Sequence, residues 1–374
     1  MRVVAEQFHI SKSTVQRWVR HAAGQRLDRV DFSDHSCRPL HTRRTPAAVE
    51  DLILDLRQDL KVHSPLGEYG PRALRQELVN RGLADIPSNR TIARILERRG
   101  ALDGLRRLRR PAPPKGWYLP DVAAAQAEVD CFDLIEDLRI QDGPLVDVLT
   151  AISLHGRLAQ AWPQAAQVTA QATLTCLLGH WRKDGLPTYA QFDNDTRFQG
   201  AHQHPDVLSR VMRLCLLLGI TPVFTPPRET GFQAQIENFN GRWQQVVWDR
   251  FHHAGLRDLR RVSSRFILAF RRRHGAREDT LPARRPMPDG FRLDLRQPVR
   301  GKIIYLRRTT DQGKVSLLGH VFPVDRHWPY RLVRCELDLT ASQIQFFALR
   351  RRDPNWQPLL NHAHHAVPQH PLKD

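Results

Sequence analysis

The sequence predicts a multidomain chain with all-α modules at its N-terminal end, a central mixed α/β domain and a small C-terminal β-barrel. Its 374 residues exceed the usual length of one domain. Apolar residues recur at helical spacing up to about residue 100, whereas strand and helix patterns alternate from 121 to 275. Short strand patterns separated by turns then fill residues 290 to 360.

Residues 1 to 30 are typical of a helix-turn-helix. Ser11 is a good N-cap for the second helix, in which Val15, Trp18 and Val19 recur at inward spacing. Such a helix lies in the major groove of DNA. An ordinary helical hairpin is the alternative. The residues left on the outer face, which we expect to contact DNA, are Lys12, Thr14, Gln16, Arg17 and Arg20.

Residues 46 to 101 predict a second helix-turn-helix. Its last helix is capped by Ser88 and buries Ile92, Ile95 and Leu96. Two such modules in tandem favour a long DNA site, and solvated charged faces are the alternative. The outer face of this helix, also expected to contact DNA, carries Asn89, Arg90, Arg94 and Arg98.

Two segments carry no predicted domain. Residues 102 to 120 form a basic, proline-rich connector, which is expected to be stiff and extended and able to follow phosphates. Residues 361 to 374 are rich in histidine, which is consistent with either a metal-binding tail or a disordered end.

The charge of the chain predicts a polyanionic partner. Lys and Arg number 57 against 39 Asp and Glu, a net charge of +18. Double-stranded DNA is the leading candidate and an acidic membrane surface the lesser one. No apolar run is long enough to span a bilayer. The five cysteines are scattered without a CxxC pair, which argues against a disulfide framework or zinc ribbon and suits a reducing cytoplasm.

Three acids stand out by their position in the central domain. Asp130 lies in the first strand, Asp193 ends a later strand in "YAQFDND", and Glu237 lies in the first turns of a helix over 233 to 251. The sheet can bring the two aspartates side by side, and the helix can lay Glu237 across them. Gathered carboxylates repel one another unless a cation joins them. Two Mg²⁺ or Mn²⁺ ions about 4 Å apart would allow phosphodiester chemistry. Composition alone would make each a surface carboxylate.

The motifs "EVDCFD", "QFDNDTRF", "LGITPVFTPP" and "GFQAQIENFNGRW" resemble the catalytic core of retroviral-type integrases and bacterial insertion-sequence transposases. These are the DDE enzymes, which have an RNase H-like fold. The resemblance covers residues 121 to 275. It matches the first-strand aspartate of the family with Asp130 and the helix glutamate with Glu237. Its Asp-Asn-Gly-x-x-Phe motif matches Asp193, Asn194 and Phe198.

The sequence departs from the family pattern at a few positions. The glycine that usually follows Asp-Asn is Asp195. Glu229 sits nearer the usual interval than Glu237 but lies in a proline-rich turn, so Glu237 is preferred. Asp133 competes with Asp130, and the two fall on opposite faces of the strand because their positions differ by an odd number, three. Asp130 is the residue we expect at the site.

The resemblance implies a DNA transposase or integrase. Metal-dependent hydrolysis at the ends of a mobile element would free a 3′-hydroxyl, and strand transfer would join it to target DNA. Asn194, Asn238 and Asn240 would support the acids or contact DNA. A homo-oligomer on DNA, associated with the nucleoid in a bacterial cytoplasm, is expected. The alternatives are a catalytically decayed transposase that serves as a DNA-binding regulator, and a nuclease of the same fold.

Overall fold

The computed structural model describes residues 1–33, 44–102, 115–200, 205–229, 231–275 and 282–369. Most of the basic connector and the last residues of the histidine-rich tail, 103–114 and 370–374, lie outside these ranges. The chain divides into two compact units, Met1–Leu52 and Ile53–Asp374, each of which is described by itself. None of the described helices is both long and apolar enough to cross a bilayer.

The first unit contains the two short helices that the sequence predicts, α1 (Arg2–Gln7) and α2 (Lys12–Ala22), and a 3-10 turn (Leu27–Arg29). The Ser11 hydroxyl accepts a hydrogen bond from the Thr14 amide at 3.1 Å, so the predicted N-cap is present. Val15 is buried, whereas Val19, expected inside, is 49% exposed. Two short helices can bury only a narrow strip of apolar surface between them, and the Val19 side chain lies outside this strip.

Three helices follow: α3 (Ala47–His63), α4 (Pro71–Asn80) and α5 (Asn89–Arg98). Ser88 caps α5 by accepting from the Thr91 amide at 3.1 Å. Ile92, Ile95 and Leu96 are fully buried, as their helical spacing predicts. The basic side chains of α5 are left on the outer face.

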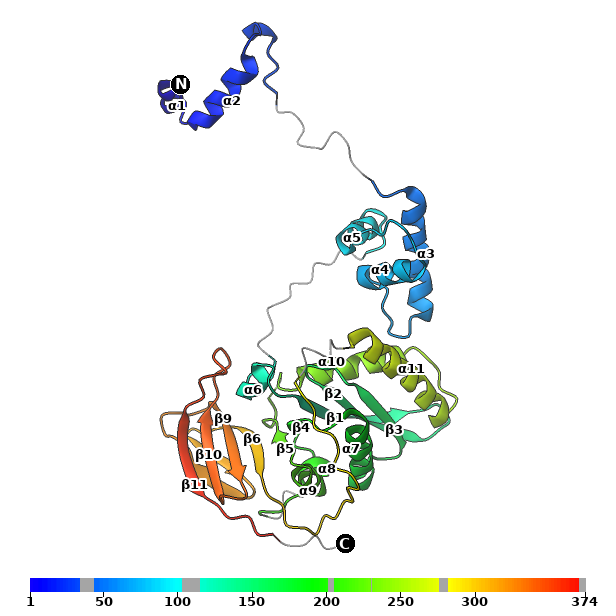
Figure 1. Ribbon diagram of the computed structural model, residues 1–374, viewed down its shortest axis with the longest axis vertical. Coiled ribbons are helices and arrows are strands. Elements are labelled where there is room, and N and C mark those ends of the chain that lie inside the picture. Colours follow the sequence, from blue (N-terminus) through cyan, green and yellow to red (C-terminus); the bar gives the residue numbers. More distant parts are fainter. Residues whose placement is uncertain (34–43, 103–114, 201–204, 230, 276–281, 370–374) are drawn as a thin grey trace. The chain divides into compact units, whose positions relative to one another are not determined.

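A large mixed sheet with helices on both faces forms the centre of the second unit, consistent with the predicted RNase H-like core (Figure 1). Its order is β11-β10-β9-β6-β5-β4-β1-β2-β3. Strands β1, β2 and β3 are antiparallel neighbours, whereas β1, β4, β5 and β6 run parallel. The core strands are β1 (Val129–Arg139), β2 (Leu145–Ser153), β3 (Gln160–Ala165), β4 (Tyr189–Phe192) and β5 (Thr221–Phe224).

The two faces of the sheet carry different helices (Figure 1). Phe132 of β1 packs in a cluster with α7 (Ala170–Asp184) and α9 (Arg210–Leu217). Cys131 and Ile135 pack on the opposite face with α10 (Ala234–Trp243) and α11 (Leu256–His274). The remaining helical segments are α6 (Pro120–Ala123), α8 (Thr196–Gln199) and the π-helical turn Gln244–Trp248.

The C-terminal strands continue the central sheet. Strand β6 pairs in parallel with β5, with Val223 opposite Ile304, and β9, β10 and β11 follow in antiparallel order. Because one edge of β6 pairs with β5, the C-terminal strands extend the central sheet, and the predicted small barrel is not confirmed. The strands themselves are present: β6 (Lys302–Arg308), β7 (Lys314–Leu317), β8 (His320–Pro323), β9 (Leu332–Asp338), β10 (Gln343–Ala348) and β11 (Leu359–His364). β7 and β8 form a separate hairpin.

An aromatic cluster fixes the end of β4. The ring of Phe192 stacks on Phe132 with centroids 5.2 Å apart, and it contacts Phe198 and Phe224 at 5.0 and 6.0 Å. All four side chains are fully buried. Since Asp193 follows Phe192 directly, this packing determines where the Asp193 carboxylate lies.

We expect Phe192→Ala to lower the free energy of unfolding of the second unit by about 3–5 kcal/mol, because it leaves a cavity among fully buried rings. Urea unfolding followed by tryptophan fluorescence measures the change. Leu268→Ala is the matched control, since Leu268 is 61% exposed, and it should cost less than about 1 kcal/mol. Equal losses in both variants would contradict the assigned core.

Candidate active site

Asp130 and Asp133 point to opposite faces of β1, as strand alternation requires. The Asp130 side chain lies on the face that α7 covers, where it contacts Trp181. The Asp133 side chain lies on the face that α10 covers, where it contacts Asn240. Only one of the two aspartates can therefore share a site with the glutamate of α10.

Asp130 is enclosed in a salt bridge. Its carboxylate is fully buried and accepts two bonds from the Arg284 guanidinium, at 2.9 and 2.8 Å. The Trp181 indole donates to Oδ2 at 3.0 Å, and His180 Nε2 lies 3.3 Å from the same oxygen. Burial alone would raise the pKa of Asp130, but Arg284 and His180 hold it well below its usual value. Both oxygens are thus engaged with protein groups.

The network around Asp130 extends into α7 and α11. His180 Nδ1 lies 3.0 Å from Asp184 Oδ2, and Arg271 binds Asp184 through both nitrogens at 2.9 and 2.8 Å. Burial would lower the pKa of His180, but the carboxylates of Asp130 and Asp184 raise it above its usual value. The structure thus places Asp130 in a structural ion network and does not bring it together with Asp193 and Glu237.

Asp133 is the aspartate that meets the other acids. Its Oδ2 accepts a hydrogen bond from Asn240 Nδ2 at 2.8 Å, and Oδ1 accepts from the Leu134 amide at 2.9 Å. Burial, together with the negative charges of Asp193 and Glu237, raises the pKa of Asp133 to about 6. These three carboxylates share one electrostatic environment.

The two acids of "DND" do different things. Asp193 Oδ1 accepts from the Asp195 amide at 3.0 Å, and burial, with Asp195 and Glu136, raises the pKa of Asp193. Asp195 is the N-cap of α8, accepting from the Arg197 amide at 2.8 Å and pairing with the Arg197 guanidinium at 2.7 Å. Asp195 is therefore a helix cap whose charge pairs with Arg197.

Glu237 lies in the first turn of α10, where the positive end of the helix favours a carboxylate. It is exposed and precedes Asn240 by one turn, so the two side chains leave the helix on the same side. The competing Glu229 pairs with Arg308, which lowers its pKa. Among the described residues, no salt bridge involves Asp133, Asp193 or Glu237.

The residues present fit hard divalent cations. All three acids offer oxygen, the donor that Mg²⁺ and Mn²⁺ prefer. The buried Oδ1 of Asn240 adds an oxygen that has no hydrogen-bond partner among the described residues. The three carboxylates do not form a group within 4.8 Å in the part of the chain described. A pair of ions about 4 Å apart needs ligands spread over a wider site than one ion does, so the carboxylates of a two-ion site need not all lie within one coordination sphere.

The other two asparagines bond to the backbone. Asn194 Nδ2 donates to the Thr225 carbonyl at 2.7 Å, and Arg307 donates to Asn194 Oδ1 at 3.0 Å. These bonds tie the end of β4 to β5 and β6. Asn238 Nδ2 donates to the Ala234 carbonyl at 2.6 Å. Asn240, by contrast, donates to a candidate-site carboxylate, that of Asp133.

The side chains expected to contact DNA lie on accessible helix faces. On α2, Lys12, Arg17 and Arg20 are exposed, and Thr14 and Gln16 are half-buried. Each of the four on α5 is exposed: Asn89, Arg90, Arg94 and Arg98. Their accessibility permits DNA contact.

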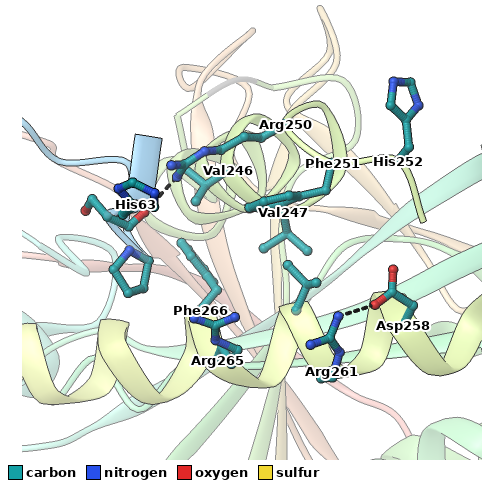
Figure 2. A pocket seen from close by; sticks show the side chains of 13 residues that line it. His63, Val246, Val247, Arg250, Phe251, His252, Asp258, Arg261, Arg265 and Phe266 are labelled. Atoms are coloured by element: carbon teal, nitrogen blue, oxygen red, sulfur yellow. Dashed lines mark hydrogen bonds and ion pairs between the residues drawn. The ribbon is translucent and has the colours of Figure 1, made fainter. Parts of the chain in front are cut away.

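A separate cavity of about 230 Å³ lies within the second unit (Figure 2). Arg250 donates to the Ser64 carbonyl at 2.7 Å, and Arg261 pairs with Asp258 at 2.6 Å. Phe266 contributes an apolar wall. None of the three acids of the candidate site lines this cavity, so we do not assign it to the same chemistry.

The sequence left Asp133 as a competitor of Asp130 and gave no indication of Arg284. The pattern "VDCFDLI" places an acid on each face of β1 without saying which face α10 covers. Arg284 follows the predicted end of the core at residue 275 and is 154 residues from Asp130. One signal was present: Glu237 and Asn240 are three residues apart and share a helix face.

No protein-family model matches the sequence, and no curated protein matches it either. Among solved structures, the catalytic core domain of BIV integrase is similar to this chain. The match covers 38% of this chain and 80% of the BIV integrase chain, with 17% sequence identity and a TM-score of 0.25. A chain of a simian T-cell lymphotropic virus intasome in complex with the PP2A regulatory subunit B56 gamma is also similar. This match covers 76% of this chain and 91% of the intasome chain, with 15% sequence identity and a TM-score of 0.33.

We expect Asp130→Asn to destabilise the second unit by about 3–5 kcal/mol, because it leaves the buried Arg284 guanidinium without its counter-charge. Chemical unfolding at pH 7 measures the loss. Glu77→Gln is the control, since it removes an accessible ion pair to Arg81 and should cost less than about 1 kcal/mol. A loss at Asp130 no larger than the control would contradict the enclosed ion pair.

We expect Asp133→Asn to stabilise the metal-free protein at pH 8 by about 3 kcal/mol. The pKa of this carboxyl rises from 3.8 to about 6 on folding, so the folded state binds more protons and loses stability as pH rises through this interval. The variant lacks the charge and escapes that loss. Unfolding in chelator from pH 4 to 8 should show the difference growing with pH. A variant less stable than wild type at pH 8 would contradict the pKa shift.

Proposed function

We propose that the chain is a DNA transposase or integrase that acts on phosphodiester bonds with divalent ions held by Asp133, Asp193 and Glu237. The observation that carries the proposal is the Asp133 carboxylate. It is oriented by Asn240, its pKa is raised to about 6, and no described cationic side chain pairs with it. The resemblance of the motifs around it to DDE enzymes supplies the reaction class.

Each residue has a distinct task in this proposal. Asp133 and Asp193 hold the ions from neighbouring parallel strands, β1 and β4, and Glu237 adds a carboxylate from α10. Asn240 fixes the Asp133 carboxylate by donating to Oδ2 at 2.8 Å. When bound, a pair of Mg²⁺ or Mn²⁺ ions would activate the attacking oxygen and stabilise the leaving oxygen of the phosphodiester.

Asp130 takes a positioning role in place of the metal-binding role that the resemblance implies. Its salt bridge with Arg284 connects β1 to the segment after α11, and its bond from Trp181 connects β1 to α7. Asp133 is carried by the same strand, so this network sets the position of the Asp133 backbone. Replacing Asp130 would therefore act through stability.

DNA is the proposed partner. The net charge of +18 favours a polyanion, and the outer faces of α2 and α5 present basic side chains. These helices would act as tandem DNA-reading modules. The C-terminal strands would act as a basic module beside the core. The protein is further proposed to assemble as a homo-oligomer on DNA and to associate with the nucleoid.

The proposal predicts that Asp133→Asn, Asp193→Asn and Glu237→Gln each lower strand transfer by about 100-fold or more, because each removes a metal ligand. The substrate is DNA ending in the sequences that flank the coding region, incubated with Mg²⁺ or Mn²⁺. Joined products on a denaturing gel are the measurement. Asp195→Asn is the matched control and should keep joining activity, since asparagine also caps helices and Asp195 pairs with Arg197.

DNA binding by each variant, measured at the same salt concentration, distinguishes the alternatives. Binding with joining that depends on the three acids supports the enzyme. Binding by wild type without cleavage or joining under any divalent ion would favour a decayed regulator. Cleavage without joining would favour a nuclease. Full activity of Asp133→Asn would overturn the assignment of Asp133.

A further inference from the structure

Asp206, His320 and His365 form a second cluster of ligand-type side chains. Asp206 Oδ2 lies 2.9 Å from His320 Nε2, and Oδ1 lies 2.8 Å from His365 Nε2. The donor atoms of all three lie within 4.8 Å of one another. Among the described residues this is the one group of at least three histidines, cysteines or acids with that spacing.

The cluster joins three segments that are distant in the sequence. Asp206 precedes α9, His320 begins β8, and His365 follows β11. Backbone hydrogen bonds support these segments: the Asp206 amide donates to the Leu318 carbonyl, two residues before His320, at 3.2 Å, and the His365 amide donates to the Ser342 carbonyl, just before β10, at 2.8 Å. The side chains therefore converge on a fixed backbone frame.

A glycine allows the close approach of two of these segments. Gly319 has a φ of +81°, and a Cβ atom there would meet Pro205 at 3.0 to 3.2 Å. Any other residue would therefore be strained in conformation and crowded against Pro205. Gly319 lies next to His320 and Pro205 next to Asp206, so this contact sets the distance between the two ligand residues.

We propose that Asp206, His320 and His365 bind a Zn²⁺ ion. Two imidazole nitrogens and one carboxylate oxygen are a donor set that zinc accepts, with a fourth position left for water. In a tetrahedral site with bonds of about 2 Å, neighbouring ligand atoms lie about 3.3 Å apart. The present spacings need a rearrangement of only about 1.5 Å to reach that geometry.

The surroundings allow entry of the ion and protect the site. The side chains of Asp206 and His365 are 18% and 12% exposed, whereas that of His320 is 43% exposed. The Phe322 ring lies 5.3 Å from His365 and 6.2 Å from His320 and covers one side. A bound ion would pin the segment before α9 to the C-terminal strands.

Without an ion, the same three side chains can form only a hydrogen-bonded group. Each imidazole then donates its Nε2 proton to a different carboxylate oxygen. Zinc binding needs neutral imidazoles with the proton on Nδ1, so protons compete with zinc and acid pH weakens binding. Zinc affinity should therefore fall as the pH is lowered, which distinguishes a zinc site from a group that only forms hydrogen bonds.

Zinc binding by the full-length chain, first stripped with a chelator, tests the proposal. We expect one tight equivalent of Zn²⁺ by competition with a chromophoric chelator, and Co²⁺ in its place should give the intense visible absorption of four-coordinate cobalt. Loss of residues around metal ligands costs about 10–100-fold in affinity, so loss of a ligand should cost at least that. Asp206→Asn and His365→Gln should therefore each weaken zinc binding by about 100-fold.

His364→Gln is the matched control, because His364 is exposed, adjacent in sequence and outside the cluster. It should leave zinc affinity unchanged. His320→Gln is a milder variant, since its side chain is half-exposed, and it keeps the test valid if the variants of the less exposed Asp206 and His365 fail to fold. Zinc affinity that survives all three cluster substitutions would assign the ion to other histidines and overturn the proposal. Absence of a tight equivalent in wild type would overturn it as well.

Discussion

The salt bridge between Asp130 and Arg284 allows β1 to carry a buried acid on one face and a candidate metal ligand on the other. A buried charge is costly unless it is paired and hydrogen-bonded, and Asp130 has the guanidinium, Trp181 and His180 around it. Asp133, three residues further along β1, has Asn240 and the Leu134 amide but no described cation. The same strand thus contains one neutralised acid and one acid with which no described cation pairs.

The pairing of the strands and the packing of α10 bring the acids of the candidate site together. Parallel pairing places β4 beside β1, so Asp193 follows the strand next to Asp133. The packing of Phe192 fixes the end of β4, and Asn194 ties it to Arg307 of β6. Helix α10 covers the Asp133 face and adds Glu237 and Asn240. Residues more than 100 positions apart are thereby held in one arrangement, in which burial and, after it, mutual repulsion raise the pKa of Asp133.

Local features of this arrangement could be predicted from the sequence, and long-range pairings could not. The caps Ser11 and Ser88 and the buried stripe of α5 follow from local chemistry, which one segment determines by itself. The interval of three residues also correctly put Asp130 and Asp133 on opposite faces. Which face α10 covers depends on tertiary packing, and so the selection of Asp130 could not be checked without the fold. The pairing of β6 with β5 is likewise set by partners distant in sequence.

A crystal soaked in Mn²⁺, with the ions located by anomalous scattering, tests the central claim most directly. We predict manganese peaks coordinated by oxygens of Asp133 and Asp193, with Glu237 in the same site, while Asp130 remains paired with Arg284. Manganese bound to Asp130, with Arg284 displaced, would contradict the account. So would a saturated soak in which no ion contacts Asp133.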